Sequence, residues 1–244
     1  MKKNKFFYLY SETMGIKHFF MWYKNNMGHN MLSLAKNDKL RDKGVGIDNL
    51  LLDLNGIFHN SAQKIFKYGS HAPPKRLLSR NLIQSNDLVD NRQNRSRCYK
   101  DICGSIENLV SVVDPSRRLI MCVDGPAPLG KQNQQRQRRF RAANDSINGR
   151  PFVDFDSNCI TPGTEFMHEL GEYINSYILR RKVESEKWKG LEVVFSNEKV
   201  PGEGEHKAVE FVREHGTDEE TYCINGPDAD LFMLALATHK PNFY

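Results

Sequence analysis

Four short apolar runs recur along the chain, and polar or helix-like segments separate them. Each run has the length and the nearly continuous apolar character of a strand that is buried on both faces of a sheet. The runs cover residues 48–55, 119–124, 191–195 and 222–225. Because strands of this kind alternate here with helical segments, we predict an α/β fold with a mostly parallel sheet flanked by helices.

Helices are expected in the intervening segments. Residues 15–26 are rich in aromatic side chains and suit an amphipathic helix. The other expected helices cover residues 56–67 and 99–113, the basic run after residue 130, and segments that begin near residues 203 and 230. The polar stretch 33–46 is interpreted as a loop, and residues 69–97 as the least structured part of the chain.

One further helix is predicted from Thr161 and Pro162. Thr is a common N-cap and Pro is favoured at the first helical position, so we expect the helix to begin at this pair. Apolar side chains recur at helical spacing over residues 166–178 and give this helix a face for packing.

The composition is that of a globular protein with local basicity. The chain has 244 residues, of which 39% are hydrophobic and 27% charged, enough for one large domain or two small ones. The net charge is +5, and residues 131–141 alone contain five cations and no acid. Since the rest of the chain is close to neutral, the pattern indicates one site for a polyanion rather than diffuse attraction.

The cysteines and the N-terminus indicate a protein of a reducing compartment, either the cytoplasm or the nucleus. The five cysteines are odd in number and lack paired metal-ligand spacing, so we expect neither a disulfide framework nor a zinc site. The run FFYLY after the N-terminal lysines is too short for a signal peptide, and no segment is long enough to cross a membrane.

The basic run KQNQQRQRRFR begins seven residues after Asp124. On a helix, its members at i, i+4, i+7 and i+8 form one stripe, because residues three and four apart are axial neighbours. The stripe consists of Lys131, Gln135, Arg138 and Arg139. Such a set suits phosphate oxygens, which Arg can bind bidentately. The competing explanation is a solvated helix face, although such faces usually mix both signs of charge. Arg136 and Arg141 point elsewhere and are interpreted as backbone contacts or solvated charges.

Six carboxylates are expected to converge at the edge of the sheet where the strands end. They are Asp53, Asp124, Glu203, Glu205, Asp228 and Asp230. The aspartates lie at the carboxyl ends of predicted strands, where open parallel sheets bind ligands, and the glutamates lie at a predicted helix start. For one such glutamate alone, a favourable interaction with the helix dipole is a sufficient explanation. Six acids together repel one another unless they bind protons or cations, so the set predicts two Mg²⁺ ions.

Two histidines lie near these acids. His59 follows Asp53 by six residues on the expected helix, which can turn it toward the same crevice. A histidine there is often a satisfied structural residue, but imidazole can also stack on a nucleic-acid base. His206 in GEGEH is interpreted as structural.

Six segments of the chain are specific in combination. They are MGIKHFF, LLLDLNGIFHN, VDGPAPLGKQNQQRQRRFR, NCITPGTEFM, VPGEGEHK and NGPDADLFMLALATH. Together they resemble the amino-terminal region of the XRN family of 5′→3′ exoribonucleases, from residue 14 to about residue 242. Residues 1–13 are interpreted as an N-terminal extension, because Met14-Gly15-Ile16 reads as a second beginning, and residues 14–244 as the nuclease domain.

The resemblance implies a PIN/FEN-like nuclease fold and a Mg²⁺-dependent hydrolase, with two ions expected and Mn²⁺ as a substitute. Such an enzyme removes nucleotides one at a time from single-stranded RNA that carries a 5′-monophosphate. By motif, all six carboxylates would be catalytic metal ligands. The stripe Lys131, Gln135, Arg138 and Arg139 would bind the 5′-phosphate, and His59 would stack on the first base.

The chain departs from the family pattern in two ways. Lys17 and His18 stand where the family has a proline before the FF pair, from which we expect little effect. The family core continues past Tyr244 with a further metal-binding Asp and an aromatic residue, so a second chain or segment that completes the core is an expected partner. The alternatives are a catalytically incompetent module that binds RNA 5′ ends, and a flap-type DNA nuclease.

Overall fold

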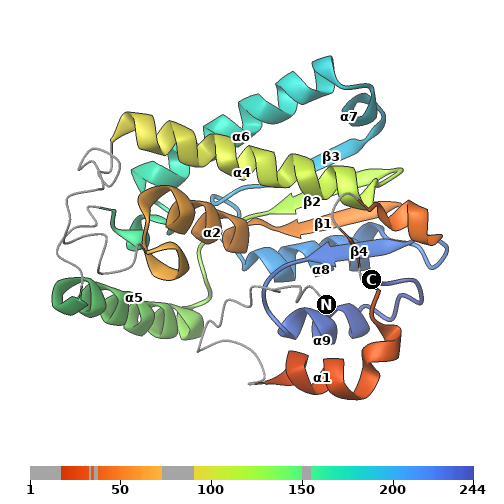
Figure 1. Cartoon of the computed structure of the whole chain (residues 1–244), viewed down its shortest axis with the longest axis horizontal. Coiled ribbons are helices and arrows are strands. Elements are labelled where there is room, and N and C mark those ends of the chain that lie inside the picture. The colour runs from red at the N-terminus through yellow and green to blue at the C-terminus, as the bar shows by residue number, and fades with distance from the viewer. Residues whose placement is uncertain (1–17, 33, 36–37, 73–90, 150–154) are drawn as a thin grey trace, which may run out of the picture.

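The computed structural model describes residues 18–32, 34–35, 38–72, 91–149 and 155–244, with the backbone alone for residues 141–149. Its strands are β1 (Asn49–Asp53), β2 (Arg118–Cys122), β3 (Glu192–Ser196) and β4 (Tyr222–Asn225). They form one sheet in the order β3-β2-β1-β4, and every neighbouring pair is parallel (Figure 1). The predicted α/β fold is therefore confirmed, and each strand overlaps its predicted apolar run.

The helices of the described residues are α1 (Phe19–Met27), α2 (Leu54–Phe66), α4 (Arg92–Val113), α5 (Leu129–Gly149), α6 (Glu165–Glu184), α7 (Glu186–Gly190), α8 (Gly204–His215) and α9 (Asp230–Leu236). The short 3₁₀ turns are η1 (Gly28–Asn30), η2 (Leu40–Lys43), η3 (Gly69–His71) and η5 (Ser157–Cys159). Within this part of the chain, no helix is both long and apolar enough to cross a membrane. All five cysteines are free.

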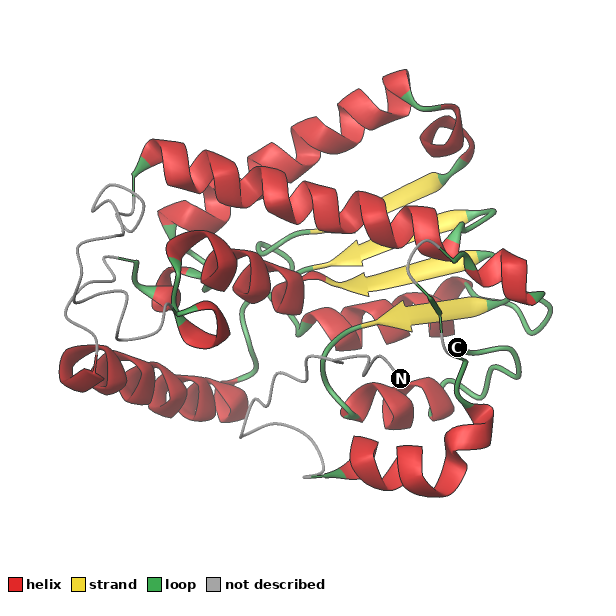
Figure 2. Cartoon of the chain, viewed as in Figure 1, coloured by secondary structure: helices red, strands yellow, loops and turns green. Residues whose placement is uncertain are grey.

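Helices cover both faces of the sheet (Figures 1 and 2). Successive side chains of a strand point to opposite faces, so β1 supplies both cores. Leu50 and Leu52 belong to the larger core, which α2, α4 and α6 complete on one face. Leu51 belongs to the smaller core on the other face, where it lies with Ala208 and Val212 of α8.

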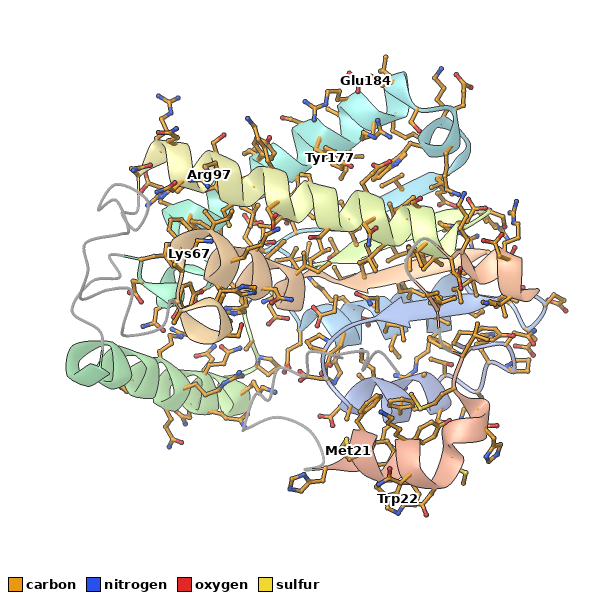
Figure 3. The ribbon with its side chains drawn as sticks, viewed as in Figure 1. Met21, Trp22, Lys67, Arg97, Tyr177 and Glu184 are labelled. Carbon is orange, nitrogen blue, oxygen red and sulfur yellow. The ribbon has the colours of Figure 1, made fainter. Side chains whose placement is uncertain are left out.

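Polar contacts and aromatic rings join neighbouring helices around this sheet. Tyr177 of α6 lies toward α4, and its hydroxyl donates to Glu107 Oε2 at 2.6 Å (Figure 3). At the opposite side of the molecule, α1 packs on α9, where the ring centroids of Tyr23 and Phe232 lie 4.9 Å apart. Trp22, on the outer side of α1, is 53% exposed (Figure 3).

Two helices begin where the sequence pattern does not place them. The sequence predicts the start of α6 at Thr161 and Pro162, but the helix begins at Glu165, and this prediction is wrong. Gly163 has a φ of +88°, which turns the chain before the helix, and Thr164 takes the N-cap position. Its Oγ1 accepts the N–H of Met167 at 3.3 Å.

Helix α4 starts at Arg92, seven residues before the predicted start, although the sequence predicts little structure over residues 69–97. Asn91 caps it, because its Oδ1 accepts the N–H of Asn94 at 2.9 Å. The predicted loop over residues 33–46 likewise contains the turn η2. Residues 73–90 lie outside the described residues.

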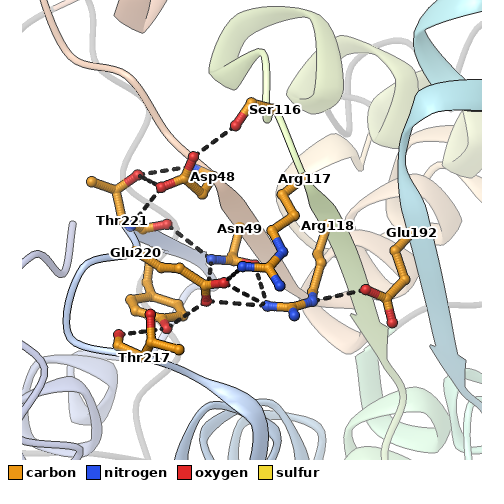
Figure 4. A network of polar contacts seen from close by, with 10 residues as sticks. Asp48, Asn49, Ser116, Arg117, Arg118, Glu192, Thr217, Glu220 and Thr221 are labelled. Carbon is orange, nitrogen blue, oxygen red and sulfur yellow. Dashed lines mark hydrogen bonds and ion pairs between the residues drawn. The ribbon is translucent and has the colours of Figure 1, made fainter.

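Charged side chains at the amino ends of the strands, here called the amino edge, are paired with one another (Figure 4). Arg118 of β2 donates through Nη1 to Asn49 of β1 at 3.2 Å and to the buried Glu220 at 3.1 Å. Its Nε donates to Glu192 of β3 at 2.9 Å. Tyr222 of β4 donates from its hydroxyl to Glu220 at 2.8 Å. The network therefore links all four strands.

Candidate metal and phosphate site

The first two acids of the candidate site are brought together by the parallel register of β1 and β2. Asp53 ends β1 opposite Cys122, the last residue of β2, and Asp124 lies two residues beyond the end of β2. Asn55 connects them, since its backbone N–H donates to Asp53 Oδ1 at 3.3 Å and its Oδ1 accepts the N–H of Asp124 at 3.0 Å. The structure thus sets these two predicted residues side by side at the carboxyl ends of the strands, here called the carboxyl edge.

The start of α8 packs directly against both aspartates. Gly204 donates its N–H to Asp124 Oδ1 at 2.7 Å. A Cβ atom at Gly204 would lie 2.7 Å from Asp53 Oδ1 and 3.5 Å from Asp124 Oδ1, so a larger residue would displace the acids. This close approach sets Glu203, the N-cap of α8, and Glu205, in its first turn, beside the aspartates.

Asp228 and Asp230 reach the same edge from the segment after β4. Gly226 lies against Asp53 there, because an added Cβ atom would be 3.5 Å from the Cβ atom of Asp53. Asp230 is the first residue of α9. The charges of Asp228 and Asp230 both help to raise the pKa of Glu205, and that of Asp228 also helps to raise the pKa of Asp53. All six predicted acids therefore lie in one coupled cluster.

Burial and mutual repulsion raise the pKa values in this cluster. Burial raises the pKa of Asp53 to about 7, and the charges of Asp124, Glu205 and Asp228 add to the shift. Burial likewise raises the pKa of Glu205 to about 7, with Asp228 and Glu203 among the contributing charges. The pKa of Asp124 is also raised, mainly by burial. The charged form of the cluster thus needs cations to become favourable.

The donor set suits a hard divalent cation. Carboxylate oxygens are the ligands that Mg²⁺ and Mn²⁺ prefer. Glu205 Oε2 is buried and has no hydrogen-bond partner among the described residues. A buried polar atom without a partner is unfavourable, and a bound cation would satisfy it. The residues present therefore fit the metal that the sequence predicts.

Among the described residues, one group of potential ligand atoms includes His206, which the sequence pattern leaves as a structural residue. Atoms of Glu203, Glu205 and His206 all lie within 4.8 Å of one another, and the four aspartates are outside this group. The side chain of His206 is 58% exposed, with Nδ1 3.8 Å from Glu205 Oε1. The interpretation of His206 as structural stays a prediction, because these distances do not give the ring a role. The place of His206 beside Glu205 in PGEGEHK is the sequence signal for this group of ligand atoms.

The predicted basic stripe lies on α5, where some of its residues lie near the acids and others line a cavity. Lys131 faces the acids, with Nζ 3.0 Å from Glu203 Oε2. Burial and the charge of Asp230 raise the pKa of Asp228, and the positive charges of Arg138 and Lys131 oppose that rise. One edge of the stripe is thus close enough to the acids to offset part of their charge.

The other edge of the stripe borders a cavity of about 620 Å³ between α5 and the segment before α6. Gln135 and Arg139 line one side, with Arg139 Nη2 3.5 Å from Gln135 Oε1. Residues 161–164 and 198–199 line the opposite side. From the sequence, Thr161 and Pro162 indicate only a helix start, and this wall is not predicted. The turn-forming pair Pro162-Gly163 is the sequence signal for it. Arg136 is exposed, and the side chain of Arg141 lies outside the described residues.

His59 lies on α2, half-buried, on the side that faces these charges. Burial lowers the pKa of His59 to about 4, and the positive charge of Arg138 contributes to the shift. The ring is therefore neutral at neutral pH. A neutral imidazole near a basic helix can present its flat face to a ligand without adding charge.

Comparison with known proteins gives one consistent result. Residues 14–244 match the family described as XRN 5'-3' exonuclease N-terminus. The chain is 36% identical over 246 residues to 5'-3' exoribonuclease 1 of Schizosaccharomyces pombe, which covers 94% of this chain and 17% of that protein. It is 36% identical over 247 residues to 5'-3' exoribonuclease 1 of Homo sapiens, with coverages of 94% and 13%. For the 5'-3' exoribonuclease 2 homolog of Drosophila melanogaster the identity is 31% over 272 residues, with coverages of 94% and 28%. The chain thus spans less than a third of the length of each of these relatives.

Proposed function

The chain belongs to the XRN family, and from that premise we propose that residues 14–244 act as the nuclease part of a 5′→3′ exoribonuclease. The reaction would be Mg²⁺-dependent hydrolysis of single-stranded RNA with a 5′-monophosphate, releasing mononucleotides. The observation that carries the proposal is the coupled cluster of six carboxylates, which lies directly beside the basic stripe of α5.

The six carboxylates would hold the metal ions. Two bound Mg²⁺ ions, or Mn²⁺ in their place, would supply an activated water and stabilise the leaving oxygen. Asn55 and Gly204 contribute by fixing the carboxylates of Asp53 and Asp124, because their N–H groups donate to these oxygens. Fixed ligands lower the cost of assembling the site when RNA binds.

The basic stripe would hold the 5′ end of the RNA. Lys131 and Arg138 lie toward the acids, and Gln135 and Arg139 line the neighbouring cavity, so together they can surround a terminal phosphate. A bounded pocket of this kind discriminates against a triphosphate or a capped end by size and charge. His59, which is neutral, would stack on the first base.

A second function, capture of RNA 5′ ends without cleavage, is favoured by one observation. The four aspartates lie outside the group of ligand atoms formed around Glu203 and Glu205. In that case a second chain or segment would be needed to complete the catalytic core.

A decay assay separates the two functions. The substrates are matched single-stranded RNAs with a 5′-monophosphate, a 5′-triphosphate or a 5′-hydroxyl, each with and without Mg²⁺. The exonuclease releases mononucleotides from the monophosphate RNA only when Mg²⁺ is present. Binding of that RNA without any decay in Mg²⁺ or Mn²⁺ would contradict the catalytic proposal and support end capture.

A further inference from the structure

Lys207 is a buried lysine that no part of the proposed mechanism uses. It lies one turn into α8, only 8% exposed, and its ammonium donates to two backbone carbonyls. The acceptors are Asn197 O at 3.0 Å and Val200 O at 3.1 Å. Both belong to the loop of residues 197–202, which connects β3 to α8 and runs directly into Glu203. A buried charge is costly unless it is paired and hydrogen-bonded, so its place here needs a reason.

The loop that Lys207 holds is locked to the segment after Asp124. Gly125 donates its N–H to Gly202 O at 2.8 Å, and Gly202 donates its N–H to Pro126 O at 3.2 Å. Val200 O lies so close to Gly125 that a Cβ atom there would be 1.7 Å away. Any movement of the Val200 carbonyl therefore moves the backbone next to Asp124.

We infer that Lys207 is a positioning residue, whose ammonium fixes the 197–202 loop and so sets Glu203 and Glu205 against Asp124. The inference rests on the proposed function, because these acids matter as metal ligands only if that function holds. Lys207 touches neither metal nor substrate in this role. Its charge also lies close enough to Asp124 to interact with it, but its positioning effect is exerted through the two carbonyls and the loop that they belong to.

The test compares the unaltered chain with Lys207→Met, which keeps an apolar stem but has no donor. Lys207→Arg keeps charge and donors, although its planar head cannot occupy the same position. Lys189→Met is the control, since Lys189 is exposed on α7 and its ammonium pairs with Glu186, on the same helix. Three measurements are made: amide hydrogen exchange over residues 197–204 without metal, Mn²⁺ affinity by calorimetry, and binding of 5′-monophosphate RNA without metal.

For Lys207→Met we expect faster exchange in the loop and Mn²⁺ affinity weakened about 10–100-fold, the usual effect of losing a group that orients metal ligands. RNA binding should stay within about 3-fold, because the basic stripe is unchanged. Lys207→Arg should give values between those of the unaltered chain and those of Lys207→Met. Lys189→Met should give the values of the unaltered chain. If Lys207→Met does not fold, the same comparison is made with Lys207→Arg.

A folded Lys207 variant with unaltered Mn²⁺ affinity would overturn the inference and leave the proposed function intact. Failure of the unaltered chain to bind Mn²⁺ would instead contradict the proposed function. A lower melting temperature alone, with normal loop exchange and metal affinity, would assign Lys207 a structural role only.

Discussion

The amino edge and the carboxyl edge of the sheet both carry charged groups but arrange them in opposite ways. At the amino edge, Glu220 is paired with Arg118 and accepts from Tyr222 (Figure 4). At the carboxyl edge, acids face acids, and Glu205 Oε2 has no partner among the described residues. At the amino edge the buried charges satisfy one another, whereas a set of acids without enough positive partners favours the binding of cations.

The same contrast appears in the protonation of individual carboxyls. Asp48, at the amino edge, has its pKa lowered, first by the N–H of Thr221 and also by the hydroxyl of Ser116 (Figure 4). Asp53, five residues later at the other end of β1, has its pKa raised to about 7. The two aspartates differ because hydrogen-bond donors stabilise the charged form of Asp48, whereas burial and, in addition, neighbouring acids disfavour the charged form of Asp53. The carboxyl edge is where we place function.

Removal of one acid from the carboxyl edge should have the largest effect on activity. Asp228→Ala or Glu203→Ala should lower Mg²⁺-dependent decay of 5′-monophosphate RNA by about 10³-fold or more, because metal stabilisation contributes several kcal/mol. The melting temperature should stay the same or rise, since repulsion is relieved. Asp218→Ala, on an exposed loop, is the control. Unchanged decay in both acid variants would show that these residues are wrongly assigned.

Removal of one acid from the amino edge should damage stability instead. Glu220→Ala leaves the buried guanidinium of Arg118 without its main partner, which typically costs about 3–5 kcal/mol. Glu192→Ala removes an exposed partner of the same arginine and should cost at most about 1 kcal/mol. Urea unfolding measures both free energies. Equal losses in the two variants would contradict the claim that burial makes Glu220 the structural partner.

The basic stripe should show a moderate effect on end selection. Arg138→Ala should reduce the preference for a 5′-monophosphate over a 5′-hydroxyl RNA by about 10–100-fold, the range for a charge-assisted hydrogen bond. Arg136→Ala is the matched control on the same helix, because Arg136 is exposed and, unlike Arg138, is not among the charges that shift the pKa values of His59 and Asp228. Decay rates on both RNAs give the ratio. Equal loss on the two substrates would reduce the stripe to general backbone binding.

The stability of the chain should depend on pH through the two carboxyls whose pKa values are raised most. Asp53 and Glu205 bind protons more tightly in the folded chain, with pKa values near 7 against ordinary values of 3.8 and 4.5. Their contribution to the free energy of unfolding is therefore fully present below about pH 4 and is lost as the pH rises through 7. Each kcal/mol that is lost should lower the melting temperature by about 2–4 °C. Asp48 acts in the opposite direction and loses its contribution in acid.

Calorimetric melting in the presence of a chelator checks this behaviour. Asp53→Asn should flatten the decline between pH 4 and 7, because it removes one of the two carboxyls responsible. Added Mg²⁺ should restore stability above pH 7. A melting temperature that rises steadily from pH 5 to 8 without metal would contradict the assignment.

The sequence predicts the sheet well because its strands are buried on both faces and leave a strong apolar signal. The run 222–225 matches β4, and the parallel order follows from the alternation with helices. Helix starts are harder to predict, because local capping decides them. Thr164 rather than Thr161 caps α6, since the left-handed Gly163 turns the chain between them. Nothing in the order of residues alone distinguishes two threonines three positions apart.

The candidate site is predictable to the extent that it depends on strand ends. Asp53 and Asp124 are neighbours because β1 and β2 are in register, and both follow from the pattern. Two other features depend on how loops far apart in the chain pack. They are the hydrogen bonds of Lys207 and the wall that residues 161–164 form on the cavity. The exposure of His206 depends on the rotation of α8. Tertiary packing of this kind leaves no periodic signal in the sequence.

We propose above that the acids of the carboxyl edge bind divalent cations. Calorimetric titration of the whole chain with Mn²⁺ at about pH 6.5, in buffers of different ionisation enthalpy, tests it most directly, because metal binding must release the protons held by raised-pKa carboxyls. We predict binding of two ions with net proton release, which Asp53→Asn reduces. Absence of binding, or binding without any proton release, would contradict the claim.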